Sequence, residues 1–360
     1  MKKLIISALV WIACLSNTFA SPHKESLFYI DSQVTEAQLQ NIKAHAKSID
    51  ILAAQVFELG ENLEITGTLK PELVSTAREN KIKLMPLFYN QNFNQDIVHR
   101  FLQDPATQNK IIAEMLKLCQ QYQLYGIQID LLNVNANDRN AFTRFVQLTA
   151  NRLHQQGYVL SIAVPQPISL LTDSAPDYAK WYDENWSGAY DYSALAQRAD
   201  FITFMLWDRH TSLTTPGPIA AYDWIEHTIQ YLLSNNISAD KISLGIPLFS
   251  GHWHTATFMD PAVGALIDEK YRYRSKRDPI NYLAALEIIK THQLQLTWND
   301  QWQSFYVMYD NSYRSEFLYL EEAKSFAAKM NLVNHYNLRG FSAWKLGMED
   351  PAIWDNSLSF

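Results

Sequence analysis

The sequence predicts an α/β fold, a (β/α)8 TIM barrel with a small α+β insertion between strands 7 and 8. Three observations predict it. Strand-like and helix-like patterns alternate along most of the 360 residues. No Gly-rich phosphate loop follows the first strand, which argues against an open doubly wound sheet. The strand at 127–132 carries Gln128, Asp130 and Leu132 on one face, as a barrel strand does when it leads to a site at its C-terminal end.

The first half of the chain supplies four strands and four helices. Apolar strands are expected at 27–30, 49–57, 83–89 and 127–132, with helices at 36–48, 71–80, 104–123 and 138–156. The fourth helix is assigned because apolar residues from Phe142 to Leu153 recur at helical spacing. Gly157 then ends this helix as a left-handed residue.

The second half continues the alternation and then interrupts it. Strands are expected at 158–164, 201–207, 242–248 and 341–346, with helices at 192–198 and 224–233. The interval at about 250–322 breaks the rhythm and contains alternating stretches at 294–298 and 303–309. We interpret it as the α+β insertion, which forms one wall of a cleft.

The first 20 residues have the pattern of a signal peptide. Lys2 and Lys3 form a basic start, a short apolar run follows, and small residues before Ala20 suit cleavage there. The run is too short for a membrane span. Export, to the periplasm or outside the cell, is therefore expected, with the barrel at 21–360. Lipid attachment at Cys14 is the less favoured alternative, because Trp11 stands where such sites want a small aliphatic residue.

Composition excludes some partners. The formal net charge of −7 argues against nucleic acid or an anionic membrane surface as partner. After cleavage Cys119 alone remains, so no intrachain disulfide is possible, and its helical pattern predicts a small buried side chain. The 10 Trp and 19 Tyr residues suit a large core and equally a carbohydrate cleft. The pattern favours no particular oligomeric state.

Several blocks occur in a characteristic order, at 125–134, 157–165, 205–210, 244–248 and 344–350. In this order and spacing the chain resembles glycoside hydrolase family 18, nearest its spore-cortex-lytic, peptidoglycan-acting branch. The resemblance covers about residues 27 to 350. It implies a cleft for N-acetylglucosamine-containing glycan, either peptidoglycan or a chitin-like polymer, and no cofactor.

The resemblance also implies roles on the fourth strand. In the family, a glutamate protonates the glycosidic oxygen and the substrate's acetamido carbonyl is the nucleophile. An aspartate two residues earlier orients the acetamido group and raises the pKa of the glutamate. The aspartate corresponds to Asp130, and the position of the general acid is Leu132, which has no ionisable proton. Gln128 stands where the signature usually has Asn or Asp.

Other positions extend the comparison to the sixth and eighth strands. Trp344 corresponds to the tryptophan that forms the floor of the family's site, and Asp208 matches the aspartate of the sixth-strand motif. Trp207 replaces the usual tyrosine, and its indole donates a single hydrogen bond. Asp130 and Asp208 are therefore the catalytic candidates. The candidates for binding sugar are Gln128, Trp207 and Trp344, together with Trp181, Tyr182 and Trp186 on the long loop after the fifth strand.

Leu132 leaves three hypotheses open. The first is a glycan-binding barrel with impaired hydrolysis. The second is an active β-N-acetylglucosaminidase or chitinase-type enzyme whose acid is a displaced carboxylate. Its acid would be one of Asp183, Glu184, Asp191 and Asp208. The third is a scaffold that engages another envelope protein and no sugar.

Histidines raise the question of a metal site. His210, His252 and His254 are candidate ligands, but no acid or Cys completes a set with them at recognisable spacing. The sequence therefore predicts no metal.

Overall fold

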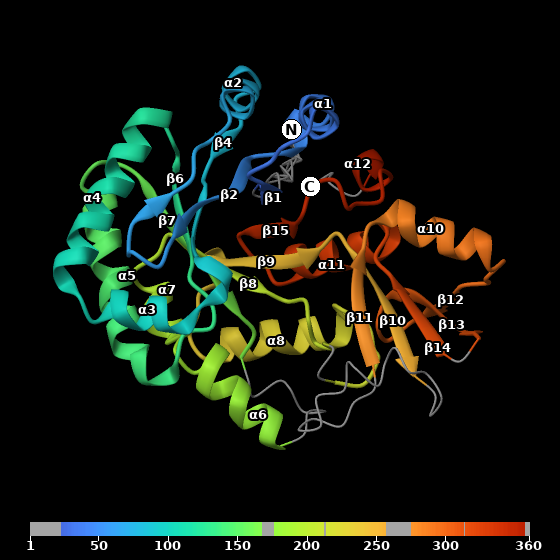
Figure 1. The fold of residues 1–360 in the computed structure, drawn as a ribbon. Coiled ribbons are helices and arrows are strands. Elements are labelled where there is room, and N and C mark those ends of the chain that lie inside the picture. Colours follow the sequence, from blue (N-terminus) through green and yellow to red (C-terminus); the bar gives the residue numbers. More distant parts are fainter. Residues whose placement is uncertain (1–22, 168–175, 212–213, 257–274, 313, 357–360) are drawn as a thin grey trace, which may run out of the picture.

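The computed structural model describes residues 23–167, 176–211, 214–256, 275–312 and 314–356. The expected signal segment at 1–20 lies outside the described residues. Eight strands form a closed parallel barrel, because each pairs with its neighbour and β15 returns to pair with β1 (Figure 1). The TIM barrel prediction is confirmed. In spatial order the strands are β1 (Glu25–Asp31), β2 (Ile51–Leu59), β5 (Leu87–Asn90), β6 (Gly126–Asp130), β7 (Val159–Pro165), β8 (Phe201–Met205), β9 (Ile242–Pro247) and β15 (Gly340–Trp344).

Helices surround this barrel, and local capping explains where several begin. Thr35 and Gln38 form a capping box at the start of α1, and Asp104 accepts the first amides of α4. Cys119 is buried in α4, as its pattern predicts. No helix of the described ranges is both long and apolar enough to cross a membrane. The helices between barrel strands are α1 (Glu36–Ala44), α2 (Pro71–Glu79), α3 (Gln95–Leu102), α4 (Pro105–Tyr122), α5 (Arg139–His154), α6 (Pro176–Tyr182), α7 (Tyr192–Ala196), α8 (Tyr222–Ser234) and α11 (Ala323–His335).

Some boundaries differ from the prediction. The third strand divides into β4 (Lys83–Leu84) and β5, because Pro86 between them has no amide to donate. The helices α3 and α11, and α10 (Tyr282–Thr291) in the insertion, lie in stretches that the sequence left unassigned, whereas α6 forms in the stretch predicted as a long loop after the fifth strand. The predicted strand at 127–132 ends at Asp130, since the Asn90 side chain takes over both backbone hydrogen-bonding groups of Leu132.

The chain between β9 and β15 forms a second sheet. It is antiparallel, with the order β11-β10-β14-β13-β12, and projects beside the barrel mouth (Figure 1). The helix α10 (Tyr282–Thr291) covers one face, where Ala285 packs with Leu318 and Leu320. We call it the insertion sheet. Its strands are β10 (Ser250–Ala256), β11 (Ser275–Ile280), β12 (Thr297–Asn299), β13 (Ser304–Asn311) and β14 (Arg314–Leu320).

A buried ion pair joins the insertion sheet to the barrel. Glu321 directly follows β14, and its amide donates to the Ser250 hydroxyl, where β10 begins. Its carboxylate accepts hydrogen bonds from Ser325 at 2.9 Å and from the Lys329 ammonium at 2.6 Å. Lys329 is fully buried and Glu321 nearly so. The two ends of the insertion sheet, at Ser250 and Glu321, are therefore connected to α11 by hydrogen bonds.

Candidate functional site

A layer of polar side chains fills the barrel below its mouth. The Tyr29 hydroxyl donates to Gln128 at 2.7 Å, and the Gln128 amide donates to Ser161 and Thr203. Thr203 contacts Ser342 at 2.9 Å. Gln128 is fully buried and its partners all belong to the barrel. It therefore lies beneath the cavity that the other candidate residues line, and acts on the site by holding this layer together.

Asp130 lies one layer higher, at the C-terminal end of β6. It is 4% exposed, and its Oδ1 atom has no hydrogen-bond partner among the described residues. Burial raises the pKa of Asp130 to about 8, because the charged carboxylate loses hydration that no protein donor replaces. At neutral pH Asp130 is therefore largely protonated.

Leu132 follows Asp130 on the same inward face. Its backbone amide donates to Asn90 Oδ1 at 2.9 Å, and its carbonyl accepts from Asn90 Nδ2 at 3.0 Å. The side chain is nearly buried and lines the mouth cavity with Asp130. The backbone at this position is thus fixed by Asn90 and independent of the Leu132 side chain.

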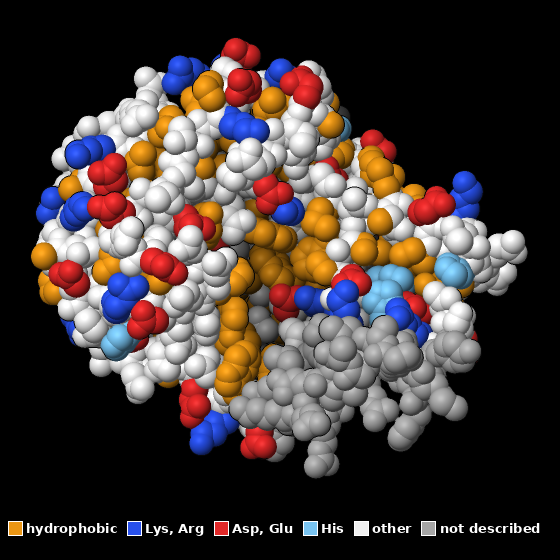
Figure 2. Space-filling model, in the orientation of Figure 1, with side chains coloured by type: hydrophobic (Ala, Val, Ile, Leu, Met, Phe, Trp, Pro, Cys, Tyr) orange, Lys and Arg blue, Asp and Glu red, His pale blue; other side chains and the backbone are white. Residues whose placement is uncertain are grey.

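The barrel mouth opens into a cavity of about 680 Å³. Figure 2 shows hydrophobic side chains gathered in a hollow near the middle of this face. Asp130, Asp208 and all the candidates for binding sugar except Gln128 line it, so residues spread over 215 positions of sequence meet at one end of the barrel. The described lining includes Gln55, Phe93, Asp130, Leu132, Gln166, Tyr178, Trp181, Tyr182, Trp186, Met205, Trp207, Asp208, Phe249, Arg277, Trp344, Lys345 and Met348.

Two tryptophans lie side by side over the polar layer. The Trp344 ring is centred 5.1 Å from that of Tyr29 and 6.3 Å from that of Trp207. Trp207 approaches β9 at Gly245, where a Cβ atom would come within 2.9 Å of the indole and 2.3 Å of a backbone oxygen. A glycine is therefore required for this close approach. The peptide bond between Trp344 and Lys345 is cis.

Asp208 lines the cavity but is bound in an ion pair. Its Oδ1 atom lies 2.5 Å from the Arg277 guanidinium, which also donates to the His210 carbonyl. The Arg277 side chain is 13% exposed and comes from β11 of the insertion sheet. Sequence reasoning missed Arg277, because no spacing signal links it to the sixth barrel strand. This ion pair occupies Asp208 Oδ1, the atom of Asp208 that faces Arg277.

The other three carboxylates proposed as a displaced acid do not reach the cavity. Asp191 caps α7 through the Ala194 amide and pairs with Arg139. Glu184 is more than half exposed beside Lys180. Asp183 contacts the Ser187 hydroxyl. Among the described residues, Asp130 and Asp208 are thus the carboxylates that line the cavity.

Aromatic side chains from the segment after β7 form part of the cavity wall. Trp181 and Tyr182 belong to α6, and Trp186 lies in η5 (Asp183–Ser187). The Trp181 ring stacks on Tyr178 at 5.8 Å, and Trp186 lies 6.1 Å from Phe93. Tyr182 is almost buried and donates to the Gln166 carbonyl. Trp181 and Trp186 are partly exposed into the cavity, so they offer flat apolar faces to a ligand.

The fold and this site together define a TIM barrel with an aromatic, carboxylate-containing mouth. The model of the glycosyl hydrolases family 18 matches residues 26–349. The chain belongs to this family.

The chain is also similar to individual proteins and to solved structures. The chain is 25% identical to the uncharacterized glycosylase YvbX of Bacillus subtilis, over 88% of this chain and 86% of the relative. It is 24% identical to the cortical fragment-lytic enzyme of the same organism, over 92% and 73%. Among solved structures, the spore cortex-lytic enzyme SleL of Bacillus cereus has a TM-score of 0.80 at 22% identity, over 94% and 74%. A chitinase of Chromobacterium violaceum has a TM-score of 0.76 at 25% identity, over 94% and 99%.

The state of Asp130 gives a prediction on stability. A carboxyl group whose pKa is higher in the folded than in the unfolded chain makes folding more favourable below the unfolded pKa. That contribution is lost as the pH rises through the folded pKa. From pH 5 to pH 8 the wild type should therefore lose free energy of unfolding relative to Asp130→Asn, which has no proton to release. Urea unfolding of both proteins at the two pH values measures the difference.

The control for this experiment is Asp177→Asn, which removes an exposed carboxylate and so accounts for the change in net charge. A free-energy difference between wild type and Asp130→Asn that stays constant from pH 5 to pH 8 would show that Asp130 is already ionised at pH 5.

Proposed function

We propose that this protein binds N-acetylglucosamine-containing glycan in its barrel mouth and hydrolyses it slowly or not at all. One observation carries the proposal: Leu132, which the family resemblance assigns to the general-acid position, lies just after β6 and lines the same cavity as Asp130. A hydrocarbon side chain at this point cannot protonate a glycosidic oxygen. The rest of the cavity offers a sugar several indole faces and the carboxyl groups of Asp130 and Asp208.

The lining supports a polymeric sugar as ligand. Pyranose rings have apolar faces that stack on indoles, and Trp344, Trp181 and Trp186 present indoles to one cavity. Protonated Asp130 can donate a hydrogen bond, and a carboxylate oxygen of Asp208 can accept one. Such a mixture of flat apolar surfaces and few polar anchors is typical of ligand sites. Of the two expected polymers, peptidoglycan glycan is favoured by the cortex-lytic relatives and chitin-like chains by the chitinases.

A second candidate function is retained hydrolysis, because Asp130 itself holds a proton at neutral pH. In that case the carboxyl group that the resemblance assigns to orienting the acetamido group would also donate a proton. The raised pKa lies close to the range in which general acids work best. This reading predicts measurable turnover by the wild type that disappears in Asp130→Asn.

The N-terminal pattern supports export, which would bring the protein to envelope glycan. Cleavage near Ala20 is part of this proposal.

Binding gives the direct test. Trp344→Ala should weaken the affinity for chito-oligosaccharides by about 30-fold, since a buried aromatic anchor contributes about 2 kcal/mol. Titration calorimetry with chito-oligosaccharides and with muropeptide glycans measures it. The matched control is Trp298→Ala, which removes an indole of β12 outside the cavity. Equal affinities for the wild type and Trp344→Ala would exclude stacking on Trp344. A wild type that neither binds nor cleaves these glycans would favour the scaffold hypothesis.

A further inference from the structure

Two strands of the insertion sheet bring three metal-binding side chains together. His252 and His254 are two residues apart on β10, so both point to the same face. Glu316 on β14 stands directly opposite His254 in the antiparallel register. Trp253, between the histidines, points to the other face and is fully buried. The acid that completes the set is thus remote in sequence, which is why spacing along the chain did not reveal it.

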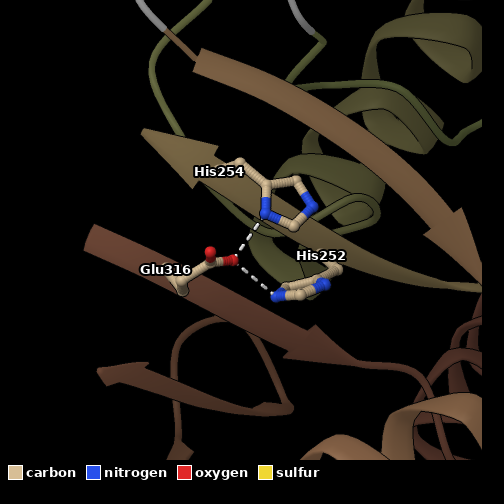
Figure 3. Close-up of side chains that lie close together, drawn as sticks. All are labelled: His252, His254 and Glu316. Atoms are coloured by element: carbon tan, nitrogen blue, oxygen red, sulfur yellow. Dashed lines mark ion pairs between the residues drawn. The ribbon is translucent and has the colours of Figure 1, made fainter. Parts of the chain in front are cut away.

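The donor atoms converge on one point, as Figure 3 shows for the two imidazoles and the carboxylate. Glu316 Oε2 lies 2.6 Å from His254 Nδ1 and 2.8 Å from His252 Nε2. Glu316 is 1% exposed. Yet neither Glu316 Oε2 nor His254 Nδ1 has a hydrogen bond of adequate geometry among the described residues. A buried carboxylate oxygen and an imidazole nitrogen therefore face each other at contact distance without an aligned hydrogen.

A second layer of side chains orients the cluster. The other nitrogen of the His254 ring, Nε2, lies 3.1 Å from Asp278 on β11. A histidine that binds a metal through one nitrogen commonly donates the other N–H to a carboxylate in this way. Lys276 in turn lies 2.8 Å from Asp278. The Tyr309 hydroxyl on β13 lies 3.0 Å from His252 Nε2.

We propose that His252 Nε2, His254 Nδ1 and Glu316 Oε2 bind a divalent transition-metal ion of the zinc type. Two imidazoles and one carboxylate suit this class, whereas calcium and magnesium prefer sites made of oxygen. Three protein ligands leave a fourth position for water beside Tyr309. The histidine side chains are 12% and 18% exposed, which gives an ion access from solvent.

The present distances are compatible with binding after small side-chain rotations. Bonds of about 2.0–2.1 Å in a tetrahedral arrangement separate neighbouring donor atoms by about 3.3 Å. The contacts of 2.6 and 2.8 Å would therefore lengthen by some tenths of an ångström. Rotation of His252 and Glu316 about their own torsions would supply shifts of this size, and His252 Nε2 would then exchange its contact with the Tyr309 hydroxyl for the ion.

The position of the cluster defines its role. Asp278 lies on the same face of the insertion sheet as the histidines, and its neighbour Arg277 points the other way, into the mouth cavity beside Asp208. The ion would therefore touch no sugar in that cavity. It would instead cross-link β10 and β14, and through Asp278 restrain β11, the strand that carries Arg277. The metal is thus a clamp on one wall of the cleft.

Direct binding tests the site. The full-length protein without a histidine tag, freed of metal by chelator and dialysis, is titrated with zinc chloride against a chromophoric competitor. We expect one zinc per chain for the wild type. Binding should weaken at least 10-fold in Glu316→Gln and in His254→Gln, and 10- to 100-fold in Asp278→Asn. Cobalt(II) should give the wild type the intense visible absorption of a tetrahedral site, and the two ligand variants should lack it.

His292→Asn is the matched control. The His292 ring lies tilted against that of Tyr309, with 4.8 Å between centroids, but belongs to none of the ligand contacts. It should bind zinc as the wild type does. The site does not exist if the wild type fails to bind zinc stoichiometrically, or if Glu316→Gln and His254→Gln retain its affinity. Circular dichroism of each variant without metal shows that it is folded, and the cobalt spectrum of the wild type is independent of any variant.

Discussion

Replacing Leu132 by glutamate is expected to raise kcat for chito-oligosaccharide hydrolysis by roughly 10²–10⁴-fold, the usual contribution of a general acid. The substitution restores a carboxyl group two residues after Asp130, in the cavity that both side chains already line. Asn90 holds the backbone of residue 132 on both sides, so the new side chain should project as Leu132 does. Two neighbouring carboxyl groups cannot both ionise easily, which keeps one of them protonated near neutral pH.

Two controls test whether the gain in kcat comes from an acidic proton at position 132. Leu132→Gln has nearly the same size as Leu132→Glu but cannot donate an acidic proton, so it should remain as slow as the wild type. Leu132→Glu with Asp130→Asn should lose much of the gain, because the acetamido group is no longer oriented. Release of reducing ends from chito-oligosaccharides and from peptidoglycan glycan measures all four proteins. Rapid turnover by the wild type, with no increase in Leu132→Glu, would refute impaired hydrolysis.

Lys329→Met should destabilise the protein by about 3–5 kcal/mol, because it leaves a buried carboxylate without its cation. Burial raises the pKa of Glu321, and the Lys329 ammonium acts in the opposite direction. Without Lys329, the chain must either bury the Glu321 charge unpaired or protonate it. Since Glu321 also ties the start of β10 to the end of β14, the insertion sheet should loosen first. Urea unfolding gives the free energy, and hydrogen exchange shows which strands lose protection.

The double variant Lys329→Met with Glu321→Leu separates pairing from packing. It removes both charges together, so it should recover most of the lost stability. Lys110→Met is the surface control, because it breaks the pair with Glu64, in which both side chains are more than half exposed. If Lys329→Met unfolds at the same urea concentration as the wild type, the buried pair contributes nothing to stability.

The order of barrel elements could be predicted from the sequence because apolar periodicity is a local property. The alternation of strands and helices held for all eight barrel strands, and the inward face of Gln128, Asp130 and Leu132 followed from the two-residue period of a strand. Boundaries were less certain where distant residues decide them. The end of β6 at Asp130 depends on Asn90, which belongs to another strand.

The site shows the same division. The sequence indicated which side chains stand at the barrel mouth, and the resemblance indicated that Leu132 replaces an acid. It could not indicate that Gln128 lies sealed beneath the cavity, because its partners come from three other strands. Nor could it show that Asp183, Glu184 and Asp191 are directed elsewhere. All three lie within a few residues of side chains that line the cavity, and only their contacts in the folded chain show that they point away from it.

By itself, the sequence determined the barrel, its family resemblance and the absence of an ionisable group at Leu132, since these depend on residue identity and short-range spacing. The tertiary structure decided the electrostatics. Burial keeps a proton on Asp130, Arg277 of the insertion sheet pairs with Asp208, and strand pairing carries Glu316 to two histidines. Charges act through space over a few ångströms, and chain folding alone sets which of them become neighbours.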